Sequence, residues 1–279
     1  MDHRILIAVV AGLVLVAFGG FFFALGPGAS DPLLPPARTA APSSAALPPV
    51  LPPLAPPAPP PLATPASIEA EIALSEHAEL QVLLKKNFSA EYAELVAVAV
   101  RRRNEGASEQ ELGQALNERF QDIMRGRLKF GAGARTPTID RLAANEASLF
   151  HALGTEGAAF CLKMLGKDET PAVATPPETV RQLMRLGTLY RFQAIVEGTP
   201  NAKPVESLTT DEMRAFEASL AREGLNFKDV STGAYLNKTA AQPGKPCLTL
   251  ETLHLAIARL GEGTRRKIYA GMFFLGRDK

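Results

Sequence analysis

The chain has 279 residues, of which 46% are hydrophobic, and its 30 basic and 29 acidic residues give a formal net charge of +1. A balance this close to zero is not typical of a protein that binds nucleic acid or of a strongly acidic one. Trp is absent and aromatic residues make up only 6%, so broad stacking platforms for bases or sugars are not expected.

The first predicted element is the apolar stretch Ile5 to Leu25, which holds 21 residues without a charge. A helix of this length spans about 30 Å, the thickness of a bilayer's hydrocarbon core. Arg4 precedes the stretch and the next basic residue is Arg38, so the positive-inside rule favours a cytoplasmic N-terminus and an exported remainder. We interpret residues 1–26 as an uncleaved transmembrane signal anchor. A cleaved signal peptide is the alternative, although its apolar core normally has about 7–15 residues.

Residues 27–66 form a predicted linker that contains 15 of the 23 prolines and 10 alanines. Proline fixes φ and removes an amide donor, so this composition excludes a regular helix or a paired strand. We expect a disordered, semi-rigid polyproline II tether that reaches on the order of 100 Å when it is extended. A docking ligand of the PxxP type is the alternative, but its spacing arises by default in so proline-rich a run.

From residue 67 to residue 279 the apolar residues recur with a helical period, and the predicted helix starts carry capping residues. Ser67 is expected to cap a first helix that runs to about Lys86, and Ser89 a second one. Three later starts carry capping boxes: Ser108 with Glu111, Thr175 with Glu178, and Thr209 with Glu212. The other expected starts are Thr136, Glu156, Thr249 and Thr264.

The stretch from Asn226 to Pro246 is expected to be the longest irregular segment, and no strand or repeat is apparent. The sequence therefore predicts an all-α fold: a C-terminal multi-helix bundle or irregular helical array over residues 67–279, with a possible sub-division near residue 170.

Cys161 and Cys247 are the two cysteines of the chain. The cysteines of an exported domain would be oxidised, so we expect these two to form one disulfide. The bond would enclose 85 intervening residues, and chain-entropy models assign a stabilisation of about 4–5 kcal/mol to a disulfide that closes a loop of this length. Two buried free thiols are the alternative. Because the pair lacks a CxxC spacing, it is a poor metal site.

Glu146 is the sharpest catalytic candidate, because it lies on a predicted apolar stripe between Leu142 and Leu149. Burial would raise the pKa of this carboxyl towards a value suited to a general acid. The run Glu146-Ala147-Ser148-Leu149-Phe150, with Gly157-Ala158 after it, resembles the Glu-Ser and Gly-rich segment of lytic transglycosylases over about a dozen residues. The family's serine directly follows its glutamate, which is not so here, and its later Gly-Leu-Met-Gln stretch has no counterpart. The structural alternative is that Glu146 lies at the edge of the stripe or pairs with a nearby arginine such as Arg141 or Arg185.

A zinc site formed by Glu146, His151 and His254 is also conceivable. His151 directly follows Phe150 of this stripe, and His254 lies beside Leu253 and Ile257 on a separate stripe. No HExxH or other ligand spacing supports it, so no metal or cofactor is expected.

Together these features predict a single-pass protein of the bacterial inner membrane. Its C-terminal helical domain would lie in the periplasm as a binding or scaffolding module, with other envelope proteins or the cell wall as partners and no role for nucleic acid. Two alternatives stay open: a peptidoglycan-cleaving enzyme that uses Glu146 as general acid/base, and a helical adaptor that faces the cytoplasm.

Overall fold

The computed structural model describes residues 62–75, 77–165, 176–233 and 244–274, and this part of the chain is helical without any strand. The predicted membrane anchor and nearly all of the predicted linker lie outside these residues. Among the described helices, none combines the length and the apolar character that a membrane crossing requires. The first group of elements comprises α2 (Pro65–Leu74), α3 (Ala78–Asn87), α4 (Ser89–Asn104), α5 (Glu109–Arg127) and the 3₁₀ helix η1 (Leu128–Gly133). The second group comprises α6 (Thr136–Thr155), α7 (Ala158–Met164), α8 (Glu178–Gly198), the 3₁₀ turn η2 (Thr199–Asn201), α9 (Thr210–Arg222), α10 (Phe227–Thr232), α11 (Lys245–Ala258) and α12 (Glu262–Phe274).

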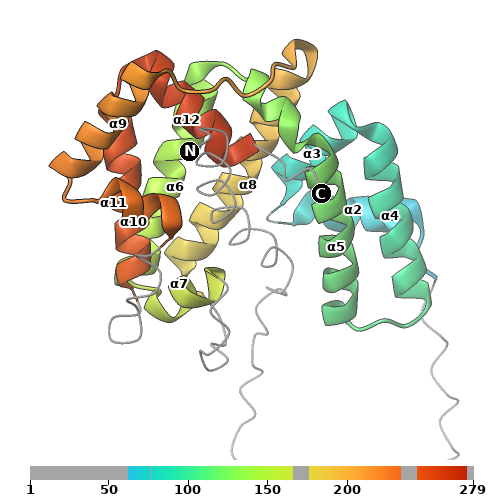
Figure 1. Ribbon diagram of the computed structural model, residues 1–279. Coiled ribbons are helices and arrows are strands. Elements are labelled where there is room, and N and C mark those ends of the chain that lie inside the picture. Colours follow the sequence, from blue (N-terminus) through green and yellow to red (C-terminus); the bar gives the residue numbers. More distant parts are fainter. Residues whose placement is uncertain (1–61, 76, 166–175, 234–243, 275–279) are drawn as a thin grey trace, which may run out of the picture.

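Helices α2 to α5 lie side by side at one end of the molecule, from cyan to green in Figure 1. Within this unit α4 packs against α2, α3 and α5. Its buried side chains recur at the helical spacing predicted for one apolar face: Tyr92, Leu95, Val96 and Ala99. Burial of this stripe against three neighbours fixes α4 as the centre of the unit.

The first predicted helix is wrong in its extent, because the structure breaks it at Ser75 into α2 and α3. Helical residues advance by about 100° each, so a continuous helix would place Ile68 and Leu80 about 120° apart. The break lets both side chains become buried, at 3% and 8% exposure. The predicted cap is also displaced. Thr64 caps α2, and Ser67 completes its capping box from the third helical position.

The helices from α6 to α12 form a second, larger unit. It is organised around α6, which packs against α8 and α11. Segment η1 packs against both α8 and α12. At the first of these contacts a Cβ on Gly198 would overlap the carbonyl oxygen of Phe130, so only glycine permits the close approach. The sub-division expected near residue 170 falls on residues 166–175, outside the described part. Helix α6, which lies before these residues in the chain, packs against α8, which follows them.

Three aromatic rings join the two units. The ring of Phe192 on α8 lies 5.5 Å from that of Phe88 and 5.8 Å from that of Phe120. Phe192 is fully buried. Arg127 lies over the ring of Phe88 and pairs with Glu91 of α4. Apolar packing of Phe88 and Phe120 against Phe192 therefore holds the smaller unit against α8, and the Arg127–Glu91 pair ties α4 to α5 beside this contact.

Some of the predicted helix starts agree with the structure and others do not. The capping boxes Ser108–Glu111 and Thr209–Glu212 are confirmed. Thr175 lies outside the described residues, and α8 begins at Glu178 after Pro177. Two expectations further along the chain are wrong. The stretch expected to be irregular contains α10, capped by Asn226, and α11 begins at Lys245, before the expected start at Thr249. The expected helix from Glu156 to Leu165 appears as the shorter α7, and the terminal helix expected from Thr264 is α12.

Candidate functional site

Glu146 lies in the core of the larger unit, on the face of α6 that meets α8. Its exposed fraction is 0%, and its Oε1 accepts a hydrogen bond from Nη2 of Arg191, which is itself only 5% exposed. Burial raises the pKa of Glu146 from 4.5 to about 7, and the positive charge of Arg191 opposes this rise. The candidate acid is therefore a buried carboxyl tied to a buried guanidinium.

The partner of Glu146 is neither of the two arginines expected from the sequence. Arg141 lies over the ring of Tyr190, with its guanidinium carbon 5.3 Å from the ring centroid. Arg191 occupies the buried stripe of α8, seven residues after the buried Met184 and four before the buried Ile195. That spacing, a basic residue in register with an apolar face, was the signal in the sequence that could have identified it.

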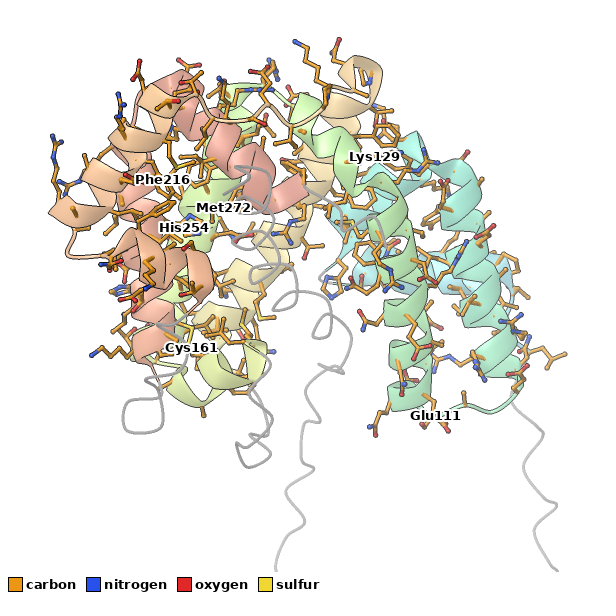
Figure 2. The ribbon with its side chains drawn as sticks, viewed as in Figure 1. Glu111, Lys129, Cys161, Phe216, His254 and Met272 are labelled. Atoms are coloured by element: carbon orange, nitrogen blue, oxygen red, sulfur yellow. A yellow bond between two sulfur atoms is a disulfide. The ribbon has the colours of Figure 1, made fainter. Side chains whose placement is uncertain are left out.

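His254 is the second buried ionisable group of this core. Its ring stacks with those of Tyr269 and Phe273 on α12 and lies 5.6 Å from that of Phe150 on α6. Its exposed fraction is 1%, and neither ring nitrogen has a hydrogen-bond partner among the described residues. Burial lowers the pKa of His254 from 6.5 to about 3. Because its pKa is lowered, the imidazole is neutral near pH 7. Figure 2 shows His254 inside the larger group of helices, where it forms part of an aromatic core.

The histidine considered as a third zinc ligand lies in a different environment. The side chain of His151 is 60% exposed, and its Nδ1 lies 3.1 Å from Oε1 of Glu251. In the part of the chain that the structure describes, no group of three or more His, Cys, Asp or Glu residues is arranged to hold a metal ion.

The chemistry available to Glu146 depends on whether a substrate can reach its buried carboxyl. Its second oxygen, Oε2, is buried and has no hydrogen-bond partner among the described residues. A polymeric substrate reaches a general acid only through an opening, because the acid must come within hydrogen-bond distance of the leaving oxygen. Use of Glu146 on a glycan would therefore require α6 and α8 to separate.

Cys161 on α7 and Cys247 on α11 are bonded to each other, with their Cα atoms 5.9 Å apart and both residues fully buried. This pairing agrees with the expectation from the sequence. The bond closes a loop that contains α8, α9 and α10. It therefore joins the segment before residue 166 to the segment after residue 243.

A groove with a volume of about 250 Å³ runs between α2 and α5, with α4 as its floor. We call it the α2–α5 groove. Most of its wall is apolar: Ile68, Ile72, Leu95, Ala99, Leu112, Leu116 and Phe120. At one end Arg103 of α4 pairs with Glu71 of α2, at 3.0 Å, and with Glu109 of α5. This guanidinium joins the two helices that border the groove.

A polar side chain also faces the groove. Gln81 of α3 lines it, and Oε1 of Gln81 is buried without a hydrogen-bond donor among the described residues. A buried acceptor that lacks a donor costs about 1–3 kcal/mol, so such atoms usually meet a ligand or an ordered water. The groove thus combines an apolar wall with one unsatisfied acceptor, and nothing in the sequence pattern indicated either feature.

A second hollow, of about 470 Å³, lies at the start of α6 and is bordered by Arg135, Lys203 and Arg266. Three cations beside a helix N-terminus resemble an anion site. The carboxylate of Glu197 pairs with the side chain of Arg135 and accepts a hydrogen bond from its backbone N–H. Arg266 donates to the carbonyl oxygens of Ala132 and Ala134, and the acidic Glu262 also borders the hollow. Two of the three cations therefore already have partners within the chain.

No protein-family model, curated protein or solved structure matches this chain.

Proposed function

We propose that this chain is a single-pass protein of the Gram-negative inner membrane, with Ile5 to Leu25 as its anchor. Its helical part acts in the periplasm as a binding or scaffolding module on the proline-rich tether, with other envelope proteins or the cell wall as its partners. The observation that carries the proposal is the buried disulfide between Cys161 and Cys247. Disulfides persist in the oxidising periplasm and are rare in the cytosol, so the bond favours export over a cytoplasmic adaptor.

Binding is favoured over catalysis by the kinds of site that the described residues offer. The α2–α5 groove is largely apolar, which suits association. The carboxyl of Glu146 is closed off in the core and tied to Arg191. A tether adds reach, which helps a binding module engage partners at a distance from its membrane.

The test is the redox state and the exposure of the chain in intact cells. Thiols are trapped by acid quenching and alkylation, and the full-length protein is compared on reducing and non-reducing gels, with Cys161→Ser as the matched control. We expect the wild-type cysteines to be protected until a reductant is added. We also expect protease added to spheroplasts to degrade the helical part. Free cysteines together with protection from protease would favour the cytoplasmic adaptor.

A second candidate function, peptidoglycan cleavage, is favoured by one observation: the pKa of Glu146 is raised to about 7, as a general acid requires. The purified full-length protein is incubated with murein and the soluble fragments are measured. If Glu146 acts as general acid/base, Glu146→Gln abolishes release, whereas the exposed Glu217→Gln does not. Under the scaffold proposal the wild-type protein releases no fragments.

A further inference from the structure

The α2–α5 groove is lined mainly by apolar side chains, of which Ile72 and Leu116 are only partly buried. Its occupant must bring apolar side chains for this wall. Arg103 already pairs with two carboxylates at one end, so an acidic occupant would meet like charges there. These requirements describe an uncharged, apolar peptide segment.

The chain itself reaches the folded part beside this groove. The backbone N–H of Ala63 donates to Oδ1 of Asn104, at 2.7 Å, and Nδ2 of Asn104 donates to the carbonyl oxygen of Ala63, at 3.0 Å. Asn104 directly follows Arg103, the residue that joins the two borders of the groove. The residues that precede Ala63 therefore start next to the groove end formed by Arg103, Glu71 and Glu109.

Those preceding residues have the required chemistry. No charged side chain occurs from residue 39 to residue 68. Leu51 and Leu54 are three residues apart, and a polyproline II helix repeats every three residues, so the two leucines share one face.

We propose that residues 47–61 of this chain fold back along α2 and that Leu51 and Leu54 insert into the α2–α5 groove. The eight residue steps from Leu54 to Leu62 span about 25 Å in polyproline II form, which exceeds the length of α2, about 15 Å. A short tether also holds the segment at an effective concentration of about 1 mM, so a weak contact suffices.

The contact has a consequence for the reach of the tether. Docking of about 15 residues at about 3.1 Å each shortens the extended tether by roughly 45 Å. The inference holds on either side of a membrane and is independent of the proposed function. A module with a docked tether stays close to its anchor, and release of the segment extends it.

Amide hydrogen exchange of the full-length protein in detergent micelles tests the contact without changing the helical part. The variant Leu51→Asp/Leu54→Asp puts charges into the docking segment, and Leu33→Asp/Leu34→Asp is the matched control further from Ala63. A contact with a Kd of about 0.1 mM is about 90% formed at the effective concentration above, so its loss raises exchange in α2 and α5 up to about tenfold. Exchange in α11 stays unchanged. No change in α2 and α5, or the same change in the control, overturns the proposal.

Photocrosslinking identifies the occupant directly. A benzophenone-bearing phenylalanine replaces Leu116 in the groove, or Gln114 on the exposed side of α5 as the control position. We expect crosslinks from position 116 to residues 47–61 of the same chain, which disappear in Leu51→Asp/Leu54→Asp. Crosslinks to another protein, to lipid or to a second copy of the chain, or none above the control, overturn the assignment. Because export is tested separately by the redox state of Cys161 and Cys247, either proposal can fail while the other stands.

Discussion

The buried pair of Glu146 and Arg191 gives a prediction for how stability changes with pH. The sign of that change shows whether burial or the charge of Arg191 dominates the pKa of Glu146. A carboxyl with a pKa of about 7 in the folded protein and about 4.5 in the unfolded chain binds its proton more tightly when folded. Its contribution to stability is then greatest below pH 4.5 and falls as the pH rises towards 7. A carboxylate stabilised mainly by Arg191 would instead have a lowered pKa and would gain stability as the pH rises.

The perturbation is Glu146→Gln, which keeps the shape of the protonated acid and cannot ionise. Each pKa unit corresponds to about 1.4 kcal/mol, so the wild type should lose roughly 3 kcal/mol relative to the variant between pH 4.5 and pH 7. His254 contributes in the opposite sense, because its lowered pKa makes stability rise with pH between about 3 and 6.5. Both proteins share that contribution, so it cancels in the difference.

The assay is urea unfolding of the full-length protein in detergent, followed by circular dichroism at 222 nm from pH 4.5 to pH 7. Glu217→Gln, an exposed position on α9, is the control and should give a flat difference from the wild type. A wild type that becomes more stable relative to Glu146→Gln as the pH rises would refute the reasoning. It would show that the attraction of Arg191 outweighs burial.

Two further predictions concern the packing of the larger unit, and the same unfolding assay checks both. Removal of the disulfide in Cys161→Ala/Cys247→Ala should lower the free energy of unfolding by about 4–5 kcal/mol, and a reductant should destabilise only the wild type. An unchanged midpoint would contradict this. Gly198→Ala should cost about 1–3 kcal/mol or more, because its Cβ would overlap the carbonyl oxygen of Phe130. Gly126→Ala in α5 meets open space and should be neutral or stabilising by up to about 1 kcal/mol. Equal effects at the two glycines would contradict the packing argument.

Local sequence signals predicted much of the helical architecture. The capping boxes at Ser108 and Thr209 start helices where expected, because both partners of a capping box lie within four consecutive residues. The apolar stripe of α4 is buried as predicted, since its period is a property of the helix itself. An all-helical fold for the described residues follows from the same patterns.

Other starts and ends depended on distant contacts. The break at Ser75 exists because Ile68 and Leu80 must both reach the core, and no capping signal at Ser67 reports this. The start of α11 is set by Lys245 and Pro246, which precede the expected cap at Thr249. Within one sequence window the earlier and later starts are equally plausible, and packing against α6 and α7 selects between them.

The candidate site divides in the same way. The apolar stripe around Glu146 was sufficient to predict its burial and its raised pKa. Its partner was not predictable, because the pairing with Arg191 depends on how α6 crosses α8. The α2–α5 groove was equally hidden, since its walls come from four helices and Gln81 looks like an ordinary surface residue in the sequence.

The sequence by itself determined the features that depend on composition and on short periods. These are the uncharged stretch Ile5 to Leu25, the proline-rich composition of residues 27–66, the helical character of the described residues and the two cysteines available for one bond. The tertiary structure decided which distant groups meet. Helix crossing places Arg191 against Glu146 and brings Cys161 to Cys247, because such pairs depend on relative positions that no local pattern encodes. It also leaves the groove between α2 and α5, which exists only because two helices that flank α4 do not close over it.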